Sequence, residues 1–156
     1  MTDVLEVAGE PGDEAIAELA RRLREADKRE LLEVSGVGPR AGLRSSVVAS
    51  EDVRGFYLDG RLIGAAGLHA LPLLGVGVPW FLGAPEVSRR PVELVRTSKR
   101  LVSEWLGRVE RLENVVAASH EESVRYLQHL GFIVEEARGN PAGFAVRRFY
   151  KERANV

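Results

Sequence analysis

Residues 119–132, with the sequence SHEESVRYLQHLGF, restrict the fold of this chain more than any other stretch, because they predict one short helix that leads directly into a strand. Ser119 and Glu122 have the spacing of a capping box, in which each side chain bonds a free backbone N–H of the first turn. The apolar residues recur at every third position, as Val124, Leu127 and Leu130. Gly131 follows where a left-handed residue commonly ends a helix, and residues 132–134, Phe-Ile-Val, predict the strand.

The composition narrows the class of protein. The 156 residues are 45% hydrophobic, which suits a single compact domain, and no linker or internal repeat divides them. The net charge of −1 gives no general attraction to nucleic acid or to a membrane surface, so we expect neither as a partner. The N-terminus lacks a signal pattern and no run of about 18 apolar residues occurs, so we expect a protein that is neither secreted nor transmembrane.

Cysteine and histidine bear on metal chemistry. The chain has no cysteine, which excludes disulfides, thiolate zinc sites and a cysteine nucleophile. His69, His120 and His129 do not have the spacing of metal ligands, so we expect structural or exposed roles for them. The sequence therefore predicts no metal site.

The first third of the chain predicts one strand and three helical segments. Residues 4–7 predict the strand, and a helical apolar face follows, formed by Ile16, Leu19, Ala20 and Leu23. Asp27 and Glu30 have capping-box spacing and predict the start of a second, short helix. After the break at residues 36–39, Gly-Val-Gly-Pro, a third helical piece carries Leu43, Val47 and Val48.

A hairpin is predicted next, because Asp59-Gly60 suits a type I′ turn between two strand-like arms. Gly64 and Gly67 in its second arm indicate a bulge or a close backbone approach. Residues 78–83 predict the following strand. Pro79 has no N–H to donate, so it must lie at a break, an edge or a bulge of that strand.

The longest helix is predicted after this strand, with Ser88 as its N-cap and Arg89 and Arg90 in its first turn. Residues 112–117 predict a strand before the helix of residues 119–132, and residues 143–150 predict the closing strand. The expected order is therefore β-α-α-β-β-β-α-β-α-β-β, with the helical pieces on either side of the break at residues 36–39 counted together.

This order and the Leu130-Gly131-Phe132 helix end resemble the GNAT superfamily of acyl-CoA-dependent N-acetyltransferases. The resemblance implies an α/β (α+β) fold, a mixed and mostly antiparallel sheet of six to seven strands flanked by about four helices. It also implies that strands four and five, here residues 78–83 and 112–117, splay apart. In the family, the pantetheine arm of acetyl-CoA lies in that cleft.

Two features depart from the family pattern. The family binds the coenzyme pyrophosphate on a glycine-rich loop after strand four, whereas residues 83–91, GAPEVSRRP, contain no glycine after Gly83. The family often carries a tyrosine, the general acid, at the position that Leu127 occupies here, and Tyr126 is one residue away, about 100° around the helix. The usual coenzyme loop and the usual acid are therefore absent or displaced.

One subgroup fits these departures. The Pro-Trp-Phe-Leu-Gly strand of residues 79–83, the loop after it and the Leu-Gly-Phe helix end resemble the internal virion protein A family of short-tailed bacteriophages. That resemblance implies a virion-assembly or structural accessory protein with a degenerate acetyl-CoA site. Its partners would be phage structural or ejection proteins, and it would be found in the host cytoplasm or the virion.

The alternative function is an acetyl-CoA-dependent N-acetyltransferase acting on a small-molecule or protein amine; a third is a sensor of acyl-CoA or nucleotides. If the chain is an enzyme, we expect Glu86 as general base and Tyr126 as displaced acid. For coenzyme binding the resemblance points to the strand-four backbone at Val78, Trp80, Phe81 and Leu82, and to Ser88, Arg89 and Arg90 for the phosphates. The structural alternatives are solvated arginines and two aromatic side chains that only fill the core.

Overall fold

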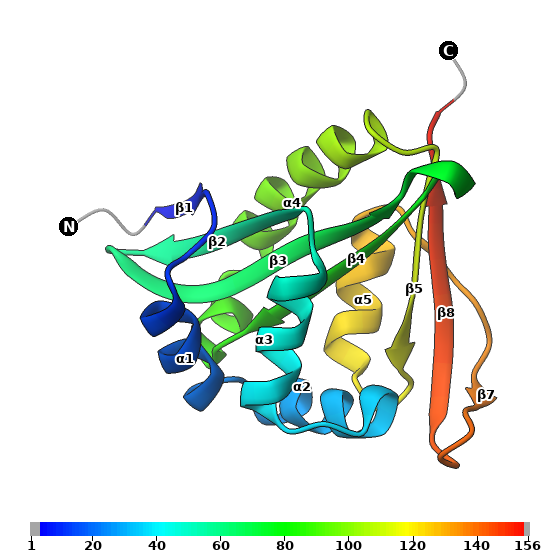
Figure 1. Ribbon diagram of the computed structural model, residues 1–156, viewed down its shortest axis with the longest axis horizontal. Helices are drawn as coiled ribbons and strands as arrows, with labels where there is room; N and C mark the ends of the chain where they lie inside the picture. The colour runs from blue at the N-terminus through cyan, green and yellow to red at the C-terminus, as the bar shows by residue number, and fades with distance from the viewer. Residues whose placement is uncertain (1–3, 155–156) are drawn as a thin grey trace.

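A computed structural model describes residues 4–154, which form an open sheet with helices on both faces (Figure 1). The strands are β1 (Leu5–Ala8), β2 (Asp52–Leu58), β3 (Arg61–Leu71), β4 (Val76–Gly83), β5 (Arg111–Ala117), β6 (Ile133–Val134), β7 (Arg138–Gly139) and β8 (Ala145–Glu152). The α-helices are α1 (Asp13–Arg21), α2 (Glu25–Glu30), α3 (Pro39–Ala49), α4 (Pro91–Leu106) and α5 (Glu121–His129). Three short helical turns complete the chain: the π-helical η1 (Leu31–Ser35) and the 3-10 turns η2 (Pro72–Leu74) and η3 (Pro85–Arg89).

The sheet has the order β1-β2-β3-β4-β5-β8-β6, with β7 paired to β8. Every neighbouring pair is antiparallel except β4 and β5, which are parallel. The predicted fold class is confirmed. The described sheet has eight strands rather than six or seven, because the segment between α5 and β8 contributes two strands of only two residues each.

The strands β4 and β5 separate soon after they meet. They are paired only at Val76 with Arg111 and at Gly77 with Leu112, and beyond that point they diverge (Figure 1). One side chain spans the start of the gap, since Asn114 Nδ2 donates to the carbonyl oxygen of Pro79 at 2.8 Å. The predicted splay is therefore present, and Pro79 lies on the strand edge that faces it.

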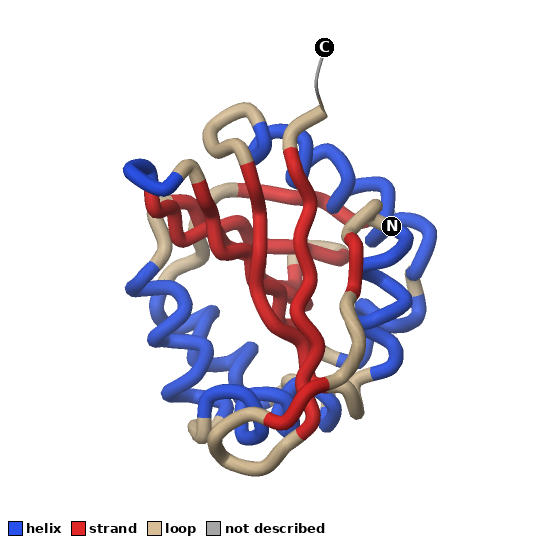
Figure 2. Tube along the Cα trace, turned by 90° about the vertical axis from the view of Figure 1, so that its right-hand side faces the viewer, coloured by secondary structure: helices blue, strands red, loops and turns tan. Residues whose placement is uncertain are grey.

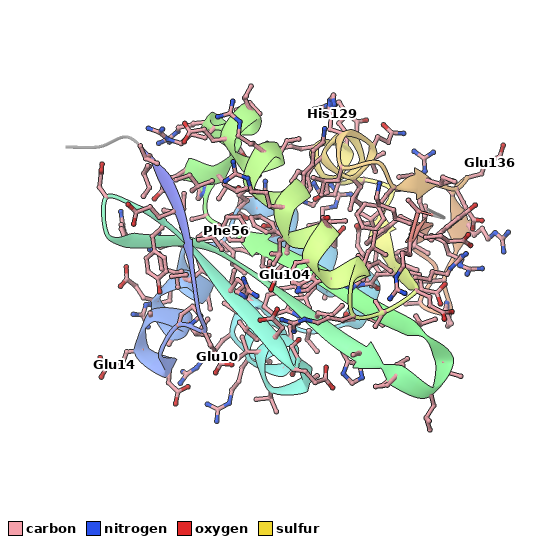
Figure 3. The ribbon with its side chains drawn as sticks, turned by 90° about the horizontal axis from the view of Figure 1, so that it is seen from above. Glu10, Glu14, Phe56, Glu104, His129 and Glu136 are labelled. Carbon is pink, nitrogen blue, oxygen red and sulfur yellow. The ribbon has the colours of Figure 1, made fainter. Side chains whose placement is uncertain are left out.

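Each face of the sheet carries its own apolar core, and Figure 2 shows helices on both sides of the strands. The core under α4 and α5 contains Phe56, which lies near the middle of the view in Figure 3. The core on the opposite face is closed by α1 and α3. Trp80 packs against this second core and Phe81 against the first, as the alternation of a strand requires.

Turn chemistry was predictable from sequence, and helix starts were not. Asp59 and Gly60 have φ values of 49° and 78°, as the predicted type I′ turn requires, and Gly131 has a φ of 93° after α5. Ser119, however, does not cap α5: its hydroxyl donates to Glu33 Oε2 at 2.7 Å, and His120 is the N-cap residue. The predicted capping box is wrong because tertiary partners compete for its side chains.

The other two predicted helix starts are also wrong. Ser88 lies inside η3, and α4 begins at Pro91, so Arg89 and Arg90 precede the helix. Asp27 lies within α2 rather than at its start, and its carboxylate is buried in contact with Arg24. Within residues 4–154, no helix is both long and apolar enough to cross a membrane.

Candidate active site

Two cavities open into the gap between β4 and β5. The first, of about 160 Å³, reaches from the gap toward η1 and α3, and we call it the carboxylate cavity. Its lining residues are Glu30, Leu31, Val34, Ser35, Ser46, Pro79, Trp80, Phe81, Leu82, Asn114, Val115, Val116, Ser123, Tyr126, Leu127 and Phe149. Glu30 is the one ionisable carboxylate among them.

The second cavity, of about 200 Å³, lies between η3, the start of α4 and α5, and we call it the cationic cavity. Its lining residues are Arg24, Phe81, Val87, Ser88, Pro91, Leu94, Val95, Glu122, Ser123, Arg125, Tyr126 and His129. Phe81, Ser123 and Tyr126 line both cavities. The two cavities therefore meet in the gap, one bringing a carboxylate and the other arginines.

Strand register decides which backbone groups of β4 face the gap. The N–H of Ala84 donates to the carbonyl of Ile63 at 2.8 Å, which places residue 84 in a hydrogen-bonded pair with the β3 side. Hydrogen-bonded pairs recur every second residue in an antiparallel ladder, so residues 80 and 82 also turn their backbone groups to β3. The backbone groups of residues 79, 81 and 83 therefore point into the gap.

Two of these three positions are satisfied within the protein. Pro79 bonds Asn114, while the N–H of Gly83 donates to Asp27 Oδ2 at 2.8 Å and its carbonyl accepts from Arg24 N–H at 2.9 Å. Across the gap, no partner for Phe81 N–H or C=O is found in residues 4–154. The Phe81 backbone thus offers one donor and one acceptor to a ligand in the gap.

Glu30 carries the most perturbed carboxyl group of the gap. Burial raises its pKa from 4.5 to about 7, and the nearby His120 and the hydrogen bond from Ala117 N–H to Oε2, at 2.8 Å, oppose this only in part. Its other oxygen, Oε1, accepts no hydrogen bond from the residues that the structure describes. A carboxylate with a pKa near neutrality and a free oxygen has the properties of a general base.

Behind Glu30 lies a buried polar network. Arg24 donates through Nε and Nη2 to the two oxygens of Asp27, both at 3.0 Å, and His120 Nε2 lies 2.6 Å from Asp27 Oδ1. His120 Nδ1 accepts from Ser123 N–H, so the proton of the neutral ring lies on Nε2 and is donated to Asp27. The network fixes Ser123 at the junction of the two cavities.

A three-residue contact, which we call the latch, crosses the cationic cavity. The third guanidinium nitrogen of Arg24, Nη1, lies 3.2 Å from Glu122 Oε2 and 3.2 Å from Ser88 Oγ. The hydroxyl of Ser88 donates to the same Glu122 oxygen at 3.0 Å. The latch therefore joins α2, η3 and α5.

The predicted pair Glu86 and Tyr126 is not brought together. Tyr126 lines both cavities, but its hydroxyl donates to Ser98 at 2.6 Å, and burial raises its pKa to about 12. Glu86 lines neither cavity and instead lies 3.6 Å from Arg22 and 3.8 Å from Arg61.

Among the residues predicted to bind coenzyme, Trp80, Phe81 and Leu82 line the carboxylate cavity and Ser88 lines the cationic cavity. Val78 lines neither. Arg89 is exposed outside the cationic cavity, and Arg90 is also outside it, bonded to Glu93 at 3.0 Å.

Sequence reasoning missed Arg24 and Glu30 as site residues. Asp27 and Glu30 share the spacing of a helix start, which concealed the fact that Asp27 is buried and that the carboxylate of Glu30 bonds β5 in the cavity wall. The available signal was the Arg24–Asp27 pair three residues apart beside an apolar helix face, which is also common on solvent-exposed helices. Within the described part of the chain, no group of three or more His, Asp or Glu side chains could hold a metal ion.

Comparisons with known proteins identify the fold. No protein-family model and no curated protein sequence matches the chain. Solved structures do match: a GNAT-family acetyltransferase from Streptococcus pneumoniae has a TM-score of 0.65 and 14% identity, covering 96% of this chain and 99% of its own. A ribosomal L7/L12 alpha-N-protein acetyltransferase in complex with coenzyme A has a TM-score of 0.72 and 10% identity, and the match covers 97% of this chain and 95% of that one. The ribosomal-protein-S18-alanine N-acetyltransferase from Escherichia coli has a TM-score of 0.68 and 12% identity, and the match covers 98% of this chain and 96% of that one.

At these identities the likeness establishes the architecture, a mixed α/β GNAT fold, and not an activity. The neighbours are described as acetyltransferases, and one of them holds coenzyme A. None of the three is described as a phage or virion protein. The expected virion role gains no support from them.

Proposed function

We propose that this protein is an acetyl-CoA-dependent N-acetyltransferase. The observation that carries the proposal is the meeting of two chemically different cavities at the free backbone of Phe81. The cavity with arginines suits the phosphates of a coenzyme, and the cavity with Glu30 suits an ammonium group. The fold supports the proposal, since its neighbours are acetyltransferases. A place in a phage particle stays a prediction.

The residues of this chain could bind the coenzyme, with arginine side chains in place of a glycine-rich loop. The C=O of Phe81 would accept a hydrogen bond from an amide N–H of a pantetheine arm, as a sheet edge binds an added strand. The loop after β4 lacks a glycine cradle, but Arg125 lines the cationic cavity and can bind phosphate oxygens through its guanidinium group. Arg24 could join it only when its Nη1 leaves Glu122. When bound, the coenzyme would supply an acetyl group activated as a thioester.

Glu30 would begin the reaction by accepting a proton from the ammonium group at Oε1, which frees the nitrogen lone pair for attack on the acetyl carbonyl. A carboxyl group with a pKa of about 7 is ionised in part at neutral pH and takes up that proton more readily than an ordinary glutamate. The Phe81 N–H points into the gap and can donate to the carbonyl oxygen as negative charge develops there.

Tyr126 is the group we propose to protonate the departing sulfur. Its hydroxyl is protonated at neutral pH, as that of an ordinary tyrosine is, and the side chain reaches both cavities. To act, the hydroxyl must leave Ser98, to which it donates at present. Tyr126→Phe should then lower kcat while the coenzyme Kd stays unchanged.

The proposal is tested by coenzyme binding and by thiol release. Acetyl-CoA at about 100 times its Kd should add about 2.7 kcal/mol to the stability of the wild-type protein, which raises its Tm. Glu30→Gln should keep that shift and lower the rate of thiol release with amines at least about 100-fold. Glu25→Gln, on an exposed position of the same helix, is the matched control. Absence of any Tm shift at millimolar acetyl-CoA would contradict the proposal.

A further inference from the structure

The carboxylate cavity has an unusual charge pattern for a polar cleft. Glu30 is its single charged lining residue, and no arginine, lysine or histidine of residues 4–154 lines it. An unpaired charge buried away from water costs several kcal/mol. An acceptor in this cavity can therefore carry one ammonium group, which pairs with Glu30, and no further charge. A free carboxylate or a second ammonium on the acceptor would find no partner in this cavity.

Most other polar groups in the wall are already engaged. Asn114 donates to Pro79 O and accepts from Val115 N–H, both at 2.8 Å, and Ser46 donates to Gly42 O at 2.9 Å. The remaining surface toward α3 and η1 is formed by Leu31, Val34 and the indole of Trp80, with the hydroxyl of Ser35 at the rim. The cavity therefore recognises an uncharged apolar body attached to one ammonium group.

Size and ring placement add to this pattern. The carboxylate cavity measures about 160 Å³, and a pantetheine arm would occupy the part beside Phe81. The acceptor is therefore limited to a body no larger than benzene, which a cavity of about 150 Å³ accommodates. Trp80 Nε1 donates to Ser50 Oγ at 2.7 Å, and its ring lies where a side chain at Gly67 would overlap it, so the indole is held in one orientation. A fixed aromatic wall favours a flat or short apolar group.

We infer that the acceptor is a small primary monoamine with an uncharged, apolar body of about one aromatic ring, and that amino acids and diamines are rejected. The inference rests on the proposed acetyltransferase activity. It follows from the single carboxylate, the apolar walls and the cavity size.

Two pairs of amines that differ by one charge test it. Phenylalanine is phenethylamine with an added carboxylate, and cadaverine is pentylamine with a second ammonium. With the wild-type protein and acetyl-CoA, kcat/KM should be at least about tenfold higher for phenethylamine than for phenylalanine, and for pentylamine than for cadaverine. Equal or reversed ratios would overturn the inference while leaving the acetyltransferase proposal intact.

Binding without chemistry provides a second readout. Trp80 lines the cavity, while Trp105, the other tryptophan, does not. Phenethylamine should quench the Trp80 fluorescence at lower concentration than phenylalanine does, with or without coenzyme. If this order holds but no amine is acetylated, the binding preference of the cavity stands, while the proposed activity and the role of the amine as acceptor fail. If no amine changes the fluorescence and none is acetylated, both fail.

A charge placed at the rim should change the preference. Ser35 is exposed at the edge of the carboxylate cavity, so Ser35→Arg supplies a cation for an acceptor carboxylate without disturbing the core. The ratio of kcat/KM for phenethylamine over phenylalanine should fall at least about threefold in this variant. Ser45→Arg adds the same charge at an exposed position outside the cavity and should leave the ratio unchanged. A ratio equally altered in both variants would count against the inference.

Discussion

Glu30 supplies the site with a carboxylate, and the burial of that carboxylate lowers the stability of the fold. Its carboxyl group is buried between α2 and the end of β5, where the backbone of Ala117 is its one hydrogen-bond donor among the described residues. Nothing in the local sequence distinguishes Glu30 from Glu25, which is exposed on the same helix. Its burial depends on how α2 docks against β5, and that is why sequence reasoning proposed Glu86 instead.

The free energy of unfolding should depend on pH because of this burial. Because the pKa of Glu30 is raised from 4.5 to about 7, the protonated form favours folding, and its contribution is full below about pH 4.5 and lost as pH rises through 7. Glu30→Gln mimics the protonated form. The variant should exceed the wild type by about 1 to 3 kcal/mol in free energy of unfolding at pH 8. The margin should close near pH 4.5.

Urea denaturation at pH 4.5, 6 and 8 measures this margin. Glu25→Gln, which removes an exposed carboxylate, should show no comparable trend. A Glu30→Gln variant that is less stable than the wild type at pH 8 would show that the ionised carboxylate stabilises the fold, contrary to the assignment.

At the scale of elements, the sequence located helices and strands well and their ends poorly. The hairpin of β2 and β3 was predictable because Asp59-Gly60 acts through local backbone geometry. The starts of α2, α4 and α5 were not, because Asp27, Ser88 and Ser119 bond distant parts of the chain rather than the first turn of a helix. Side chains suited to capping are also suited to tertiary hydrogen bonds.

The latch leads to a prediction about η3 and α5. With Glu122 in place, Nη1 of Arg24 is bonded to Glu122 Oε2 and Ser88 Oγ, so this guanidinium is not free to bind an anion in the cationic cavity. Glu122→Gln should tighten the acetyl-CoA Kd about fivefold, equivalent to about 1 kcal/mol. Titration calorimetry measures the change.

Glu121→Gln is the matched control, because Glu121 lies exposed in the same first turn of α5 and its substitution removes the same charge. Equal tightening in both variants would mean that overall charge, and not the latch, governs affinity. Weaker binding by Glu122→Gln would mean that the latch organises the cavity instead of competing with the coenzyme.

At the scale of the whole molecule, the sheet consists of two parts that share little. The strands β1 to β4 form one part, and β5, β8, β6 and β7 form the other, with two residue pairs of β4 and β5 between them. The mixed, mostly antiparallel sheet was predictable from sequence through the resemblance, and so was the splay. The chemical contrast between the cavities was not, because it depends on side chains from α2 and α5 that meet only in the folded protein.

Asn114 should limit how far the two parts move. Asn114→Ala removes the hydrogen bond to Pro79 O across the gap and should cost about 1 kcal/mol of stability. Amide hydrogen exchange at Gly83 and Ala117, whose N–H groups are bonded to Asp27 and Glu30 at the two edges of the gap, should become faster than expected from that loss alone. Asn140→Ala, which removes hydrogen bonds near β7, should not affect these two amides. Unchanged exchange at Gly83 in the Asn114 variant would contradict a bracing role.

The short junction of β4 and β5 lies at one end of β4, far from the tip of that strand. Six residues separate Gly77, where the pairing ends, from Gly83 at the tip of β4, and an extended chain covers about 20 Å over that length. A rotation of about 5° at the junction would therefore displace the tip by about 2 Å, more than a carbon–carbon bond length, while both residue pairs stay formed. The length of acyl chain that the gap accepts would then depend on the stiffness of two residue pairs at its far end, and not only on the side chains along its walls.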